Sequence, residues 1–232
     1  GTMAQMFLSD LRDKTRRGQL GRVLKGRVAG GKAFGYDVLP GDGSGHGARR
    51  INPAEAAIVR RIFELFAGGI SPRAIAKKLN AEGVLGPGGR PWQDTTLRGQ
   101  LERGTGILNN TLYIGKLAWN RCSYIKDPRT GKRVARVNPP ARWETVDLPD
   151  LRIVDQGLWD AAKARQNAVS FVMARDGSGN ALNRAHRRKF LLSGLLTCGC
   201  CGGGYTIVGK DVYDCRRHRG MGNCPNGTLV SR

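Results

Sequence analysis

The chain has 232 residues, of which 39 are Lys or Arg and 18 are Asp or Glu, so its formal net charge is +21 and its isoelectric point about 10.6. Self-repulsion on this scale is tolerated most readily when a polyanion neutralises it, which favours nucleic acid as the partner. Aromatic residues make up 6% of the chain, too few for a platform that stacks single-stranded bases, so duplex DNA is the better candidate. The sequence shows no signal peptide and no apolar stretch of membrane-spanning length, which predicts a reducing compartment and no membrane partner.

Positive charge gathers in three stretches of the sequence. Eight Lys or Arg and one acid lie between Arg12 and Lys32, and seven Lys or Arg and one acid lie between Arg121 and Arg142. A third cluster comprises Arg184, Arg187, Arg188 and Lys189. A single cluster of this kind is often only a solvated surface, but three of them beside structured segments favour contacts with the DNA backbone.

The N-terminal third predicts a helix followed by a hairpin. Residues Ala4 to about Lys25 have partial helical periodicity, but the apolar stripe is too narrow for this helix to fold alone. A glycine-rich passage over residues 26–35 releases the chain into an extended stretch around Phe34–Leu39. Residues 41–47, rich in glycine, indicate a hairpin tip.

Three helix starts follow, each marked by a capping residue. Asn52-Pro53 opens a helix with an apolar face formed by Ile58, Ile62, Leu65 and Phe66, and Ser71-Pro72 opens the next, which ends by Gly83. Asp94 is expected to cap a third helix, with Leu97 and Leu101 facing inward and a set of polar side chains facing outward, namely Thr95, Thr96, Arg98, Gln100 and Arg103.

This order of helices suggests a helix-turn-helix with a polar recognition helix. Arg can donate to guanine and Gln can pair with adenine in the major groove, while Thr can contact a base or a phosphate. The connection before the third helix is about ten residues, longer than a tight turn, so the motif would be a variant. The alternative is an ordinary three-helix core with a polar outer face.

The remaining central segment predicts strands over residues 112–119 and 142–146, on either side of a basic hairpin from Lys126 to Arg136. Asp155 is expected to cap a helix that runs to about Gln166. Residues from about 168 to 188 have the composition of a polar linker, which would span on the order of 25 Å if flexible.

The C-terminal cysteines predict a zinc site. Cys198 and Cys201 form a C-x2-C step among glycines, and Cys215 and Cys224 follow after thirteen and eight intervening residues. Four thiolates complete the tetrahedron that Zn²⁺ accepts, and short strands at Tyr205–Val208 and Asp211–Asp214 would bring the second pair to the first, as in a zinc ribbon. Disulfides and idle thiols are the alternatives, and Cys200 or His218 could replace one of the four ligands.

The chain resembles the DNA-binding part of the large serine recombinases, the phage integrases and related transposases. The motifs occur in family order at residues 31–36, 51–56, 92–97, 110–115 and 153–159, and residues 190–202 resemble the entry into the family's zinc ribbon. The resemblance implies four parts. Residues 4–30 would be the end of a long linker helix and a segment that crosses the minor groove, and residues 31–167 would be the recombinase domain. Residues 168–189 would be a polar linker. Residues 190–232 would be a zinc ribbon domain cut before a coiled-coil insertion.

The resemblance also implies a function. The chain would bind one half of an attachment site in duplex DNA for a parent integrase that cuts through a phosphoserine linkage and religates without cofactor energy. None of the eight serines lies in the family's catalytic motif, and the first three residues resemble a cloning scar, so the chain is expected to be an inactive fragment. It would be a monomer alone, whereas the parent would form a dimer on each site and a tetramer in synapsis. A cytoplasmic, nucleoid-associated protein of bacterial or phage origin is expected.

The sequence therefore predicts an α+β chain, with a mainly helical, helix-turn-helix-like recombinase domain carrying small β-strands and a following zinc-ribbon β module. The alternatives are a stand-alone helix-turn-helix and zinc-ribbon transcription regulator, or a basic protein of an RNA particle. One structural Zn²⁺ is expected, and no catalytic residue. The predicted metal ligands are Cys198, Cys201, Cys215 and Cys224, and the predicted DNA-binding residues are Arg16, Arg17, Arg22, Lys25, Arg27, Lys32, Thr95, Thr96, Arg98, Gln100, Arg103, Arg133, Arg187, Arg188 and Lys189.

Overall fold

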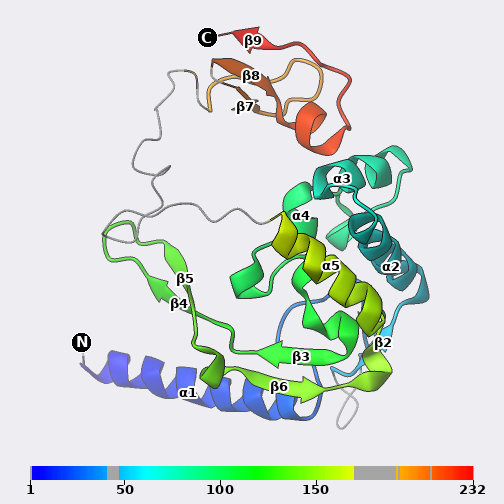
Figure 1. The fold of residues 1–232 in the computed structure, drawn as a ribbon. Helices are drawn as coiled ribbons and strands as arrows, with labels where there is room; N and C mark the ends of the chain where they lie inside the picture. The colour runs from blue at the N-terminus through cyan, green and yellow to red at the C-terminus, as the bar shows by residue number, and fades with distance from the viewer. Residues whose placement is uncertain (1, 41–46, 170–191, 193, 210, 232) are drawn as a thin grey trace. The chain divides into compact units, whose positions relative to one another are not determined.

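The computed structural model describes residues 2–40, 47–169, 192, 194–209 and 211–231 (Figure 1). The chain forms two compact units, and each unit is built from two stretches of sequence. The first unit contains residues 1–64 and 98–159, and the second contains residues 65–97 and 160–232. Helices and small antiparallel sheets occur together, which confirms the α+β class. No helix in the described part of the chain has both the length and the apolar character that a bilayer crossing requires.

Among the described residues, helix α1 (Thr2–Leu24) makes its tertiary contacts in its C-terminal half. Val23 is buried, and α1 lies beside strand β6 (Glu144–Asp147), as Figure 1 shows. The Arg16 guanidinium also lies 5.7 Å from the centre of the Trp119 ring. The predicted helix is confirmed, but Phe7 of its predicted apolar stripe, near the other end, is 67% exposed.

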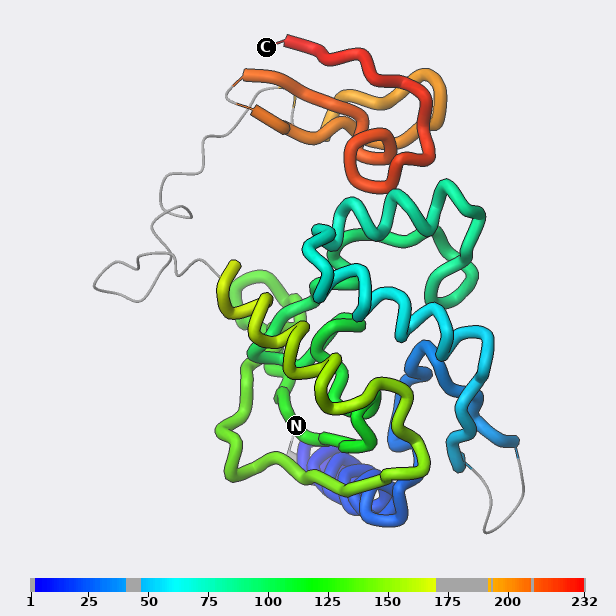
Figure 2. Tube along the Cα trace, turned by 45° about the vertical axis from the view of Figure 1, so that its right-hand side comes forward, coloured from blue at the N-terminus to red at the C-terminus, as the bar shows by residue number. Residues whose placement is uncertain are grey.

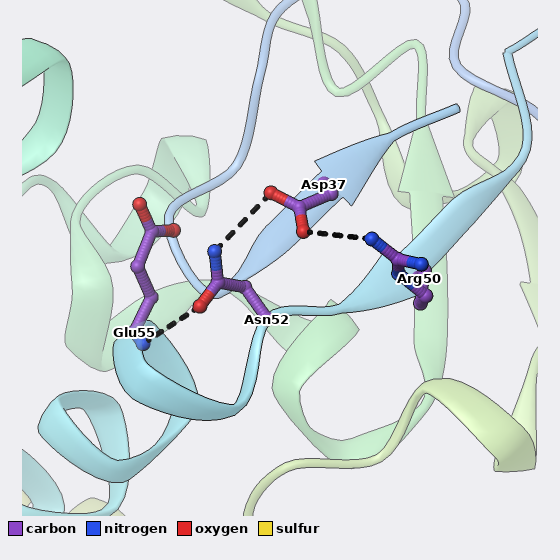
Figure 3. A network of polar contacts seen from close by, with 4 residues as sticks. All are labelled: Asp37, Arg50, Asn52 and Glu55. Atoms are coloured by element: carbon purple, nitrogen blue, oxygen red, sulfur yellow. Dashed lines mark hydrogen bonds and ion pairs between the residues drawn. The ribbon is translucent and has the colours of Figure 1, made fainter. Parts of the chain in front are cut away.

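The predicted N-terminal hairpin is present as β1 (Tyr36–Val38) paired antiparallel with β2 (Arg49–Ile51); its tip at residues 41–46 lies outside the described residues. Asn52 joins this hairpin to α2 (Pro53–Ala67), as Figure 3 shows. Its side-chain oxygen accepts from the Glu55 amide at 3.2 Å, and its side-chain amide donates to Asp37 at 3.2 Å. Asp37 also pairs with Arg50 at 3.6 Å. The predicted cap at Asn52 is confirmed, and it fixes the direction of α2 against β1 and β2.

An aromatic cluster forms the core of the first unit. Tyr36 and Tyr113 stack with ring centres 6.0 Å apart, and Phe63 on α2 contacts Tyr113 edge-on at 6.2 Å and Trp159 at 5.6 Å. Four stretches of sequence, which the tube in Figure 2 colours by residue number, therefore contribute to one aromatic cluster. The face predicted for α2 was partly wrong, because Val59 and Phe63 are fully buried whereas Ile58 and Leu65 are only half-buried.

The part of the second unit before residue 170 is mainly helical. In α3 (Pro72–Ala81) the Ser71 hydroxyl accepts from the Ala74 amide, as predicted, and the apolar face is buried. The Asn80 side chain exchanges two hydrogen bonds with the Trp92 backbone, at 2.7 and 3.0 Å. In α5 (Gln156–Ala168), which the Asp155 carboxylate caps, Arg165 donates to the carbonyls that follow the end of α2 at Gly69 and Ile70.

Two further antiparallel pairs lie in the first unit. Strand β3 (Lys116–Trp119) pairs with β6, and β4 (Cys122–Lys126) pairs with β5 (Arg133–Val137). The strand predicted over residues 112–119 was wrong in its first half. There the Asn110 side chain caps a 3-10 turn at Thr111–Ile114, which Gly115 ends with a left-handed φ of 76°.

The other short helical turns in the described part of the chain are Pro87–Gly89, Leu101–Arg103, Ile107–Asn109, Pro140–Arg142, Pro149–Leu151 and the π-helical Arg217–Met221.

Tyr36→Phe is expected to destabilise the protein by about 1–3 kcal/mol, because it removes the two hydrogen bonds that the buried Tyr36 hydroxyl donates. The Tyr36 hydroxyl lies 2.7 Å from the Leu151 carbonyl oxygen and 3.0 Å from that of Leu112, and burial raises its pKa so that the phenol keeps its proton. Urea unfolding followed by tryptophan fluorescence measures the effect. Tyr124→Phe, at a tyrosine 61% exposed, is the control and should leave the midpoint in place. Equal midpoints for the two variants would contradict this account of the core.

Candidate metal centre and nucleic-acid interface

Four cysteine thiols meet in the C-terminal module. The sulfur atoms of Cys198, Cys201, Cys215 and Cys224 all lie within 4.8 Å of one another. The sulfurs of Cys201 and Cys215 are 3.6 Å apart, and those of Cys198 and Cys224 are 3.9 Å apart. A tetrahedron with Zn–S bonds of about 2.3 Å has S···S edges of about 3.8 Å. The sulfur arrangement therefore fits one zinc ion with little adjustment.

A three-stranded sheet and a tight turn position the four thiols. Strand β8 (Val212–Cys215) pairs with β7 (Tyr205–Ile207) on one side and β9 (Val230–Ser231) on the other, and it carries Cys215. In the turn that holds the first pair, the Cys198 amide donates to the Gly203 carbonyl and the Gly202 amide donates to the Cys198 carbonyl, both at 2.8 Å. The two predicted strands of a zinc ribbon are confirmed, and β9 is a third that the sequence patterns did not indicate.

The thiols differ in how readily they ionise. The Asn226 side-chain amide donates to the Cys198 sulfur at 3.1 Å, and this hydrogen bond is the main reason that the Cys198 pKa is lowered to about 6. Burial raises the pKa of the Cys215 thiol. Without a cation, Cys198 is thus favoured as a thiolate, whereas Cys215 resists ionisation. A divalent metal ion supplies the positive charge that lets all four ionise together.

The two competing ligands lie outside the cluster. Cys200 is exposed, and the His218 ring nitrogen Nδ1 lies 2.9 Å from the Cys224 carbonyl oxygen. Asn226 contacts the site as a hydrogen-bond donor, since its side-chain amide donates to the Cys198 sulfur at 3.1 Å and to the Tyr205 hydroxyl at 3.0 Å. Its sequence position, two residues after a predicted ligand, was the only available signal for it.

The predicted recognition helix is much shorter than expected. Helix α4 covers only Asp94–Arg98, so Gln100 and Arg103 do not lie on it, and Leu101 is 53% exposed instead of buried. The helix stops because Gly99 adopts a left-handed φ of 53°, and a side chain there would collide with the backbone of Thr105. Thr95 and Arg98 on α4 are exposed, Thr96 is half-buried, and Leu97 is buried as predicted.

Residues 100–105 form a closed turn, which we name the recognition turn. The amide and carbonyl of Gln100 exchange two hydrogen bonds with those of Thr105, both at 3.2 Å. Gly104 adopts a left-handed φ of 60°, and a side chain there would meet the Arg121 guanidinium. Buried Asn109 donates to the carbonyls of Arg98 and Thr105, at 2.7 and 2.9 Å. Gln100 is exposed and Arg103 half-buried on a turn whose backbone is held on both sides.

The other predicted DNA-binding residues fall into three places. The N-terminal set is exposed except for half-buried Arg27, and it comprises Arg16, Arg17, Arg22, Lys25, Arg27 and Lys32. Arg133 is exposed on β5, where its guanidinium lies 4.8 Å from the centre of the Tyr124 ring. Arg187, Arg188 and Lys189, like the predicted linker that contains them, lie outside the described residues.

Comparisons with known protein families agree with the resemblance seen in the sequence. Residues 53–168, half of the chain, match the family model described as Recombinase. Residues 191–231 match the model described as the recombinase zinc beta ribbon domain. The second match and the clustered thiols together identify the C-terminal module as a zinc ribbon that holds one structural Zn²⁺.

One curated relative is a Bacillus subtilis (strain 168) protein named "Putative DNA recombinase", which is 26% identical over 236 residues. The alignment covers 94% of this chain but only 43% of that relative, so the chain spans less than half of the relative's length. Two solved structures also match, described as "Crystal Structure of a LSR-DNA Complex" and "Sequence Requirements of the Listeria innocua prophage attP site". Both are 18% identical and cover 94% of this chain; the TM-scores are 0.40 and 0.41, and the shares of those chains covered are 61% and 80%.

Removal of zinc is expected to unfold the ribbon and spare the aromatic core of the first unit, because a structural zinc contributes folding energy directly to a small module. Cys215→Ser should lose the zinc that metal analysis detects, since this thiol lies on the central strand of the ribbon sheet. Cys200→Ser is the matched control and should keep one zinc per chain. Full zinc content in Cys215→Ser, or zinc loss in Cys200→Ser, would show that the ligand set is different.

Proposed function

Because the chain belongs to the Recombinase family, we propose that it binds duplex DNA sequence-specifically, as the DNA-recognition part of a site-specific serine recombinase. Its target would be one half of an attachment site. The observation that carries the proposal is the polar surface that Arg98 and the recognition turn present in the first unit, in a chain with a net charge of +21. A rigid polar surface can distinguish base pairs, and the surplus charge supplies the general attraction to phosphates.

Base discrimination would come from the C-terminal end of α4 and from the recognition turn. Arg98 and Arg103 are the candidates for bidentate contacts with guanine, and Gln100 is the candidate for a contact with adenine. Thr95 and Thr96 would add contacts with bases or phosphates. The closed backbone of the turn supports this assignment, because side chains on a fixed backbone lose less conformational freedom when they bind.

Contacts with the sugar–phosphate backbone would come from the basic residues along the rest of the chain. The exposed side chains Arg16, Arg17, Arg22, Lys25 and Lys32, together with half-buried Arg27, lie on the C-terminal half of α1 and on the segment that follows it. Such a segment suits a narrow minor groove, which attracts Arg and Lys. Arg133 on the central hairpin, and Arg187, Arg188 and Lys189 in the predicted linker, would extend the contacts toward the zinc ribbon.

The catalytic step would belong to a parent protein longer than the chain described here. The chain spans 43% of the length of its curated relative, and residues 1–232 contain no serine in the catalytic motif of the family. The four parts that the resemblance implies would then divide the work. The end of the linker helix would lead from the catalytic domain, and the recombinase domain and zinc ribbon would each bind a part of the half-site. The chain alone would be a monomer, and the parent would assemble as dimers on each site and a tetramer in synapsis.

Alanine at Arg98 or Arg103 is expected to reduce the preference for cognate over random duplex DNA, because each bidentate base contact contributes about 1–3 kcal/mol of discrimination. Arg17→Ala is the matched control, with the same loss of charge. It should weaken binding to all sequences alike and lower the slope of log affinity against log salt by about one. Titrations of both DNAs at several salt concentrations measure the difference. Equal loss of cognate and random binding in the Arg98 and Arg103 variants would remove the recognition turn from base reading.

Residues 1–232 are expected to bind DNA without cutting it. Cleavage by a serine needs an activated hydroxyl and a cluster of positive groups aimed at the charge of the transition state, and none of the eight serines lies in the family's catalytic motif. Supercoiled plasmid carrying the site should stay intact while a complex forms at low salt. The complex should dissociate as salt rises, since six to ten phosphate contacts cost roughly 10³–10⁵ in affinity between 50 and 200 mM. A nicked plasmid or a covalent protein–DNA adduct would contradict this prediction.

A further inference from the structure

The central hairpin, β4 with β5, is an isolated two-stranded ribbon. Within the described residues these two strands pair only with each other, from Cys122 opposite Val137 to Lys126 opposite Arg133. In Figure 1 the ribbon leaves the end of the β3–β6 pair as a separate element. An isolated hairpin is only marginally stable in water, so a ribbon of this kind is expected to have a binding partner.

The chemistry of the ribbon identifies an anionic partner. Five basic side chains between residues 126 and 136 are exposed, namely Lys126, Arg129, Lys132, Arg133 and Arg136. The single acid of this stretch, Asp127, is occupied by the turn, because its carboxylate accepts from the Arg129 amide at 2.9 Å and from the Thr130 hydroxyl at 2.8 Å. These hydrogen bonds hold the pKa of Asp127 below its usual value, with the Arg129 amide as the main cause. The acid shapes the tip of the ribbon and leaves the basic side chains outward.

The base of the ribbon is fixed by hydrogen bonds. Asn120, the one non-glycine described residue with a positive φ, at 61°, turns the chain from β3 toward β4. On the returning strand, buried Asn138 donates from its backbone to the Arg121 carbonyl at 2.8 Å and from its side chain to the Asn120 carbonyl at 2.7 Å. The Trp143 indole then donates to the Asn138 carbonyl at 2.9 Å. Because both strands are anchored, the ribbon has a defined direction where it leaves the first unit.

Arg121 joins this base to the recognition turn. Its guanidinium donates to the Thr111 hydroxyl at 2.6 Å and to the Gly104 carbonyl at 3.3 Å, and it lies 5.6 Å from the centre of the Trp143 ring. Its Nε atom is buried and makes no hydrogen bond within the part of the chain that the structure describes. The half-buried guanidinium of Arg121 is therefore held against Gly104, Thr111 and Trp143, although the sequence counted Arg121 among the basic residues of this stretch.

We propose that the β4–β5 ribbon is a second DNA-binding element, which lies along a groove of the duplex, and that Arg121 positions it relative to the recognition turn without touching DNA. The proposal rests on the proposed function. The major groove admits a two-stranded β-ribbon, and the exposed Lys and Arg side chains can reach phosphates on its walls. A positioning residue between the two elements would keep them in one spacing along the DNA.

The test of the ribbon uses a random-sequence duplex at several salt concentrations, so it does not depend on sequence-specific recognition. The variant Lys132→Ala with Arg133→Ala should lower the salt slope by about two, since two phosphate contacts are removed. The matched control is Lys116→Ala with Arg152→Ala, which removes the same charge from exposed positions of the first unit outside the ribbon. Slopes that change equally in the two variants would show that the ribbon contributes only net charge and would overturn its assignment.

The test of Arg121 uses Arg121→Lys, which keeps the charge but cannot donate to Gly104 and Thr111 as a fork. The probes are the duplex that the unmodified chain selects from a random library and a random duplex. The preference for the selected duplex is expected to fall about tenfold, which is the effect of losing one base contact. The salt slope should stay unchanged, because no phosphate contact is lost. Thr111→Val, which removes one acceptor at similar size, should change the preference in the same direction.

The outcomes separate the inference from the proposed function. A salt slope that falls by about one in Arg121→Lys, with the preference intact, would make Arg121 a phosphate contact and overturn its positioning role. An unchanged preference in both Arg121→Lys and Thr111→Val would also overturn the positioning role of Arg121. An unmodified chain that selects no sequence would refute sequence-specific binding, while the salt slopes on random DNA would still decide whether the ribbon binds DNA.

Discussion

Repulsion among its basic side chains limits how this chain can fold. With a net charge of +21, the long basic segments cannot pack against one another, and each must be attached to a neutral core at a few points. The aromatic cluster of Tyr36, Phe63, Tyr113 and Trp159 is that core in the first unit, because it joins four distant stretches of sequence. Arg49 provides another such attachment point. Its guanidinium donates to the Gly26 carbonyl at 3.1 Å and so holds the segment after α1 against the hairpin. The basic surface thus depends on a small number of buried contacts.

The sequence predicted best those features that depend on neighbours along the chain. The caps at Asn52, Ser71 and Asp155 were predicted correctly, because a capping side chain acts on amides two or three residues later. The spacing of the cysteines was equally informative, since C-x2-C places two thiols on one short turn whatever surrounds them. Such patterns are set by local geometry, so they survive without knowledge of the fold.

The errors arose where a local pattern competes with contacts made elsewhere in the fold. Residues 112–114 have strand-forming side chains, but Tyr113 is needed in the aromatic core and its hydroxyl donates to the Phe34 carbonyl at 2.9 Å, so the segment folds as a 3-10 turn. The recognition helix was predicted too long because the inward positions of Leu97 and Leu101 fit helical spacing. Gly99 was the available signal for an earlier end, and its meaning became clear only from the close approach of Thr105. The roles of Arg121 and Asn226 depend on partners far along the chain; spacing gave no signal for Arg121 and only the nearness of Cys224 for Asn226.

The zinc centre reduces the repulsion among the basic side chains of its own module. Four thiolates around one Zn²⁺ carry a net charge of −2, whereas four neutral thiols carry none. Residues 216–219, Arg-Arg-His-Arg, directly follow the ligand Cys215, and Arg217 donates to the carbonyl of the ligand Cys201 at 3.2 Å. The anionic centre therefore lies next to basic side chains that would otherwise repel one another. Arg219 is also paired with the buried carboxylate of Asp214 at 3.8 Å, so this carboxylate and the metal–thiolate cluster would both offset positive charge in the zinc ribbon. This balance gives zinc a second effect in the module, because its loss would remove both the cross-link between the strands and the negative charge that the neighbouring arginines face.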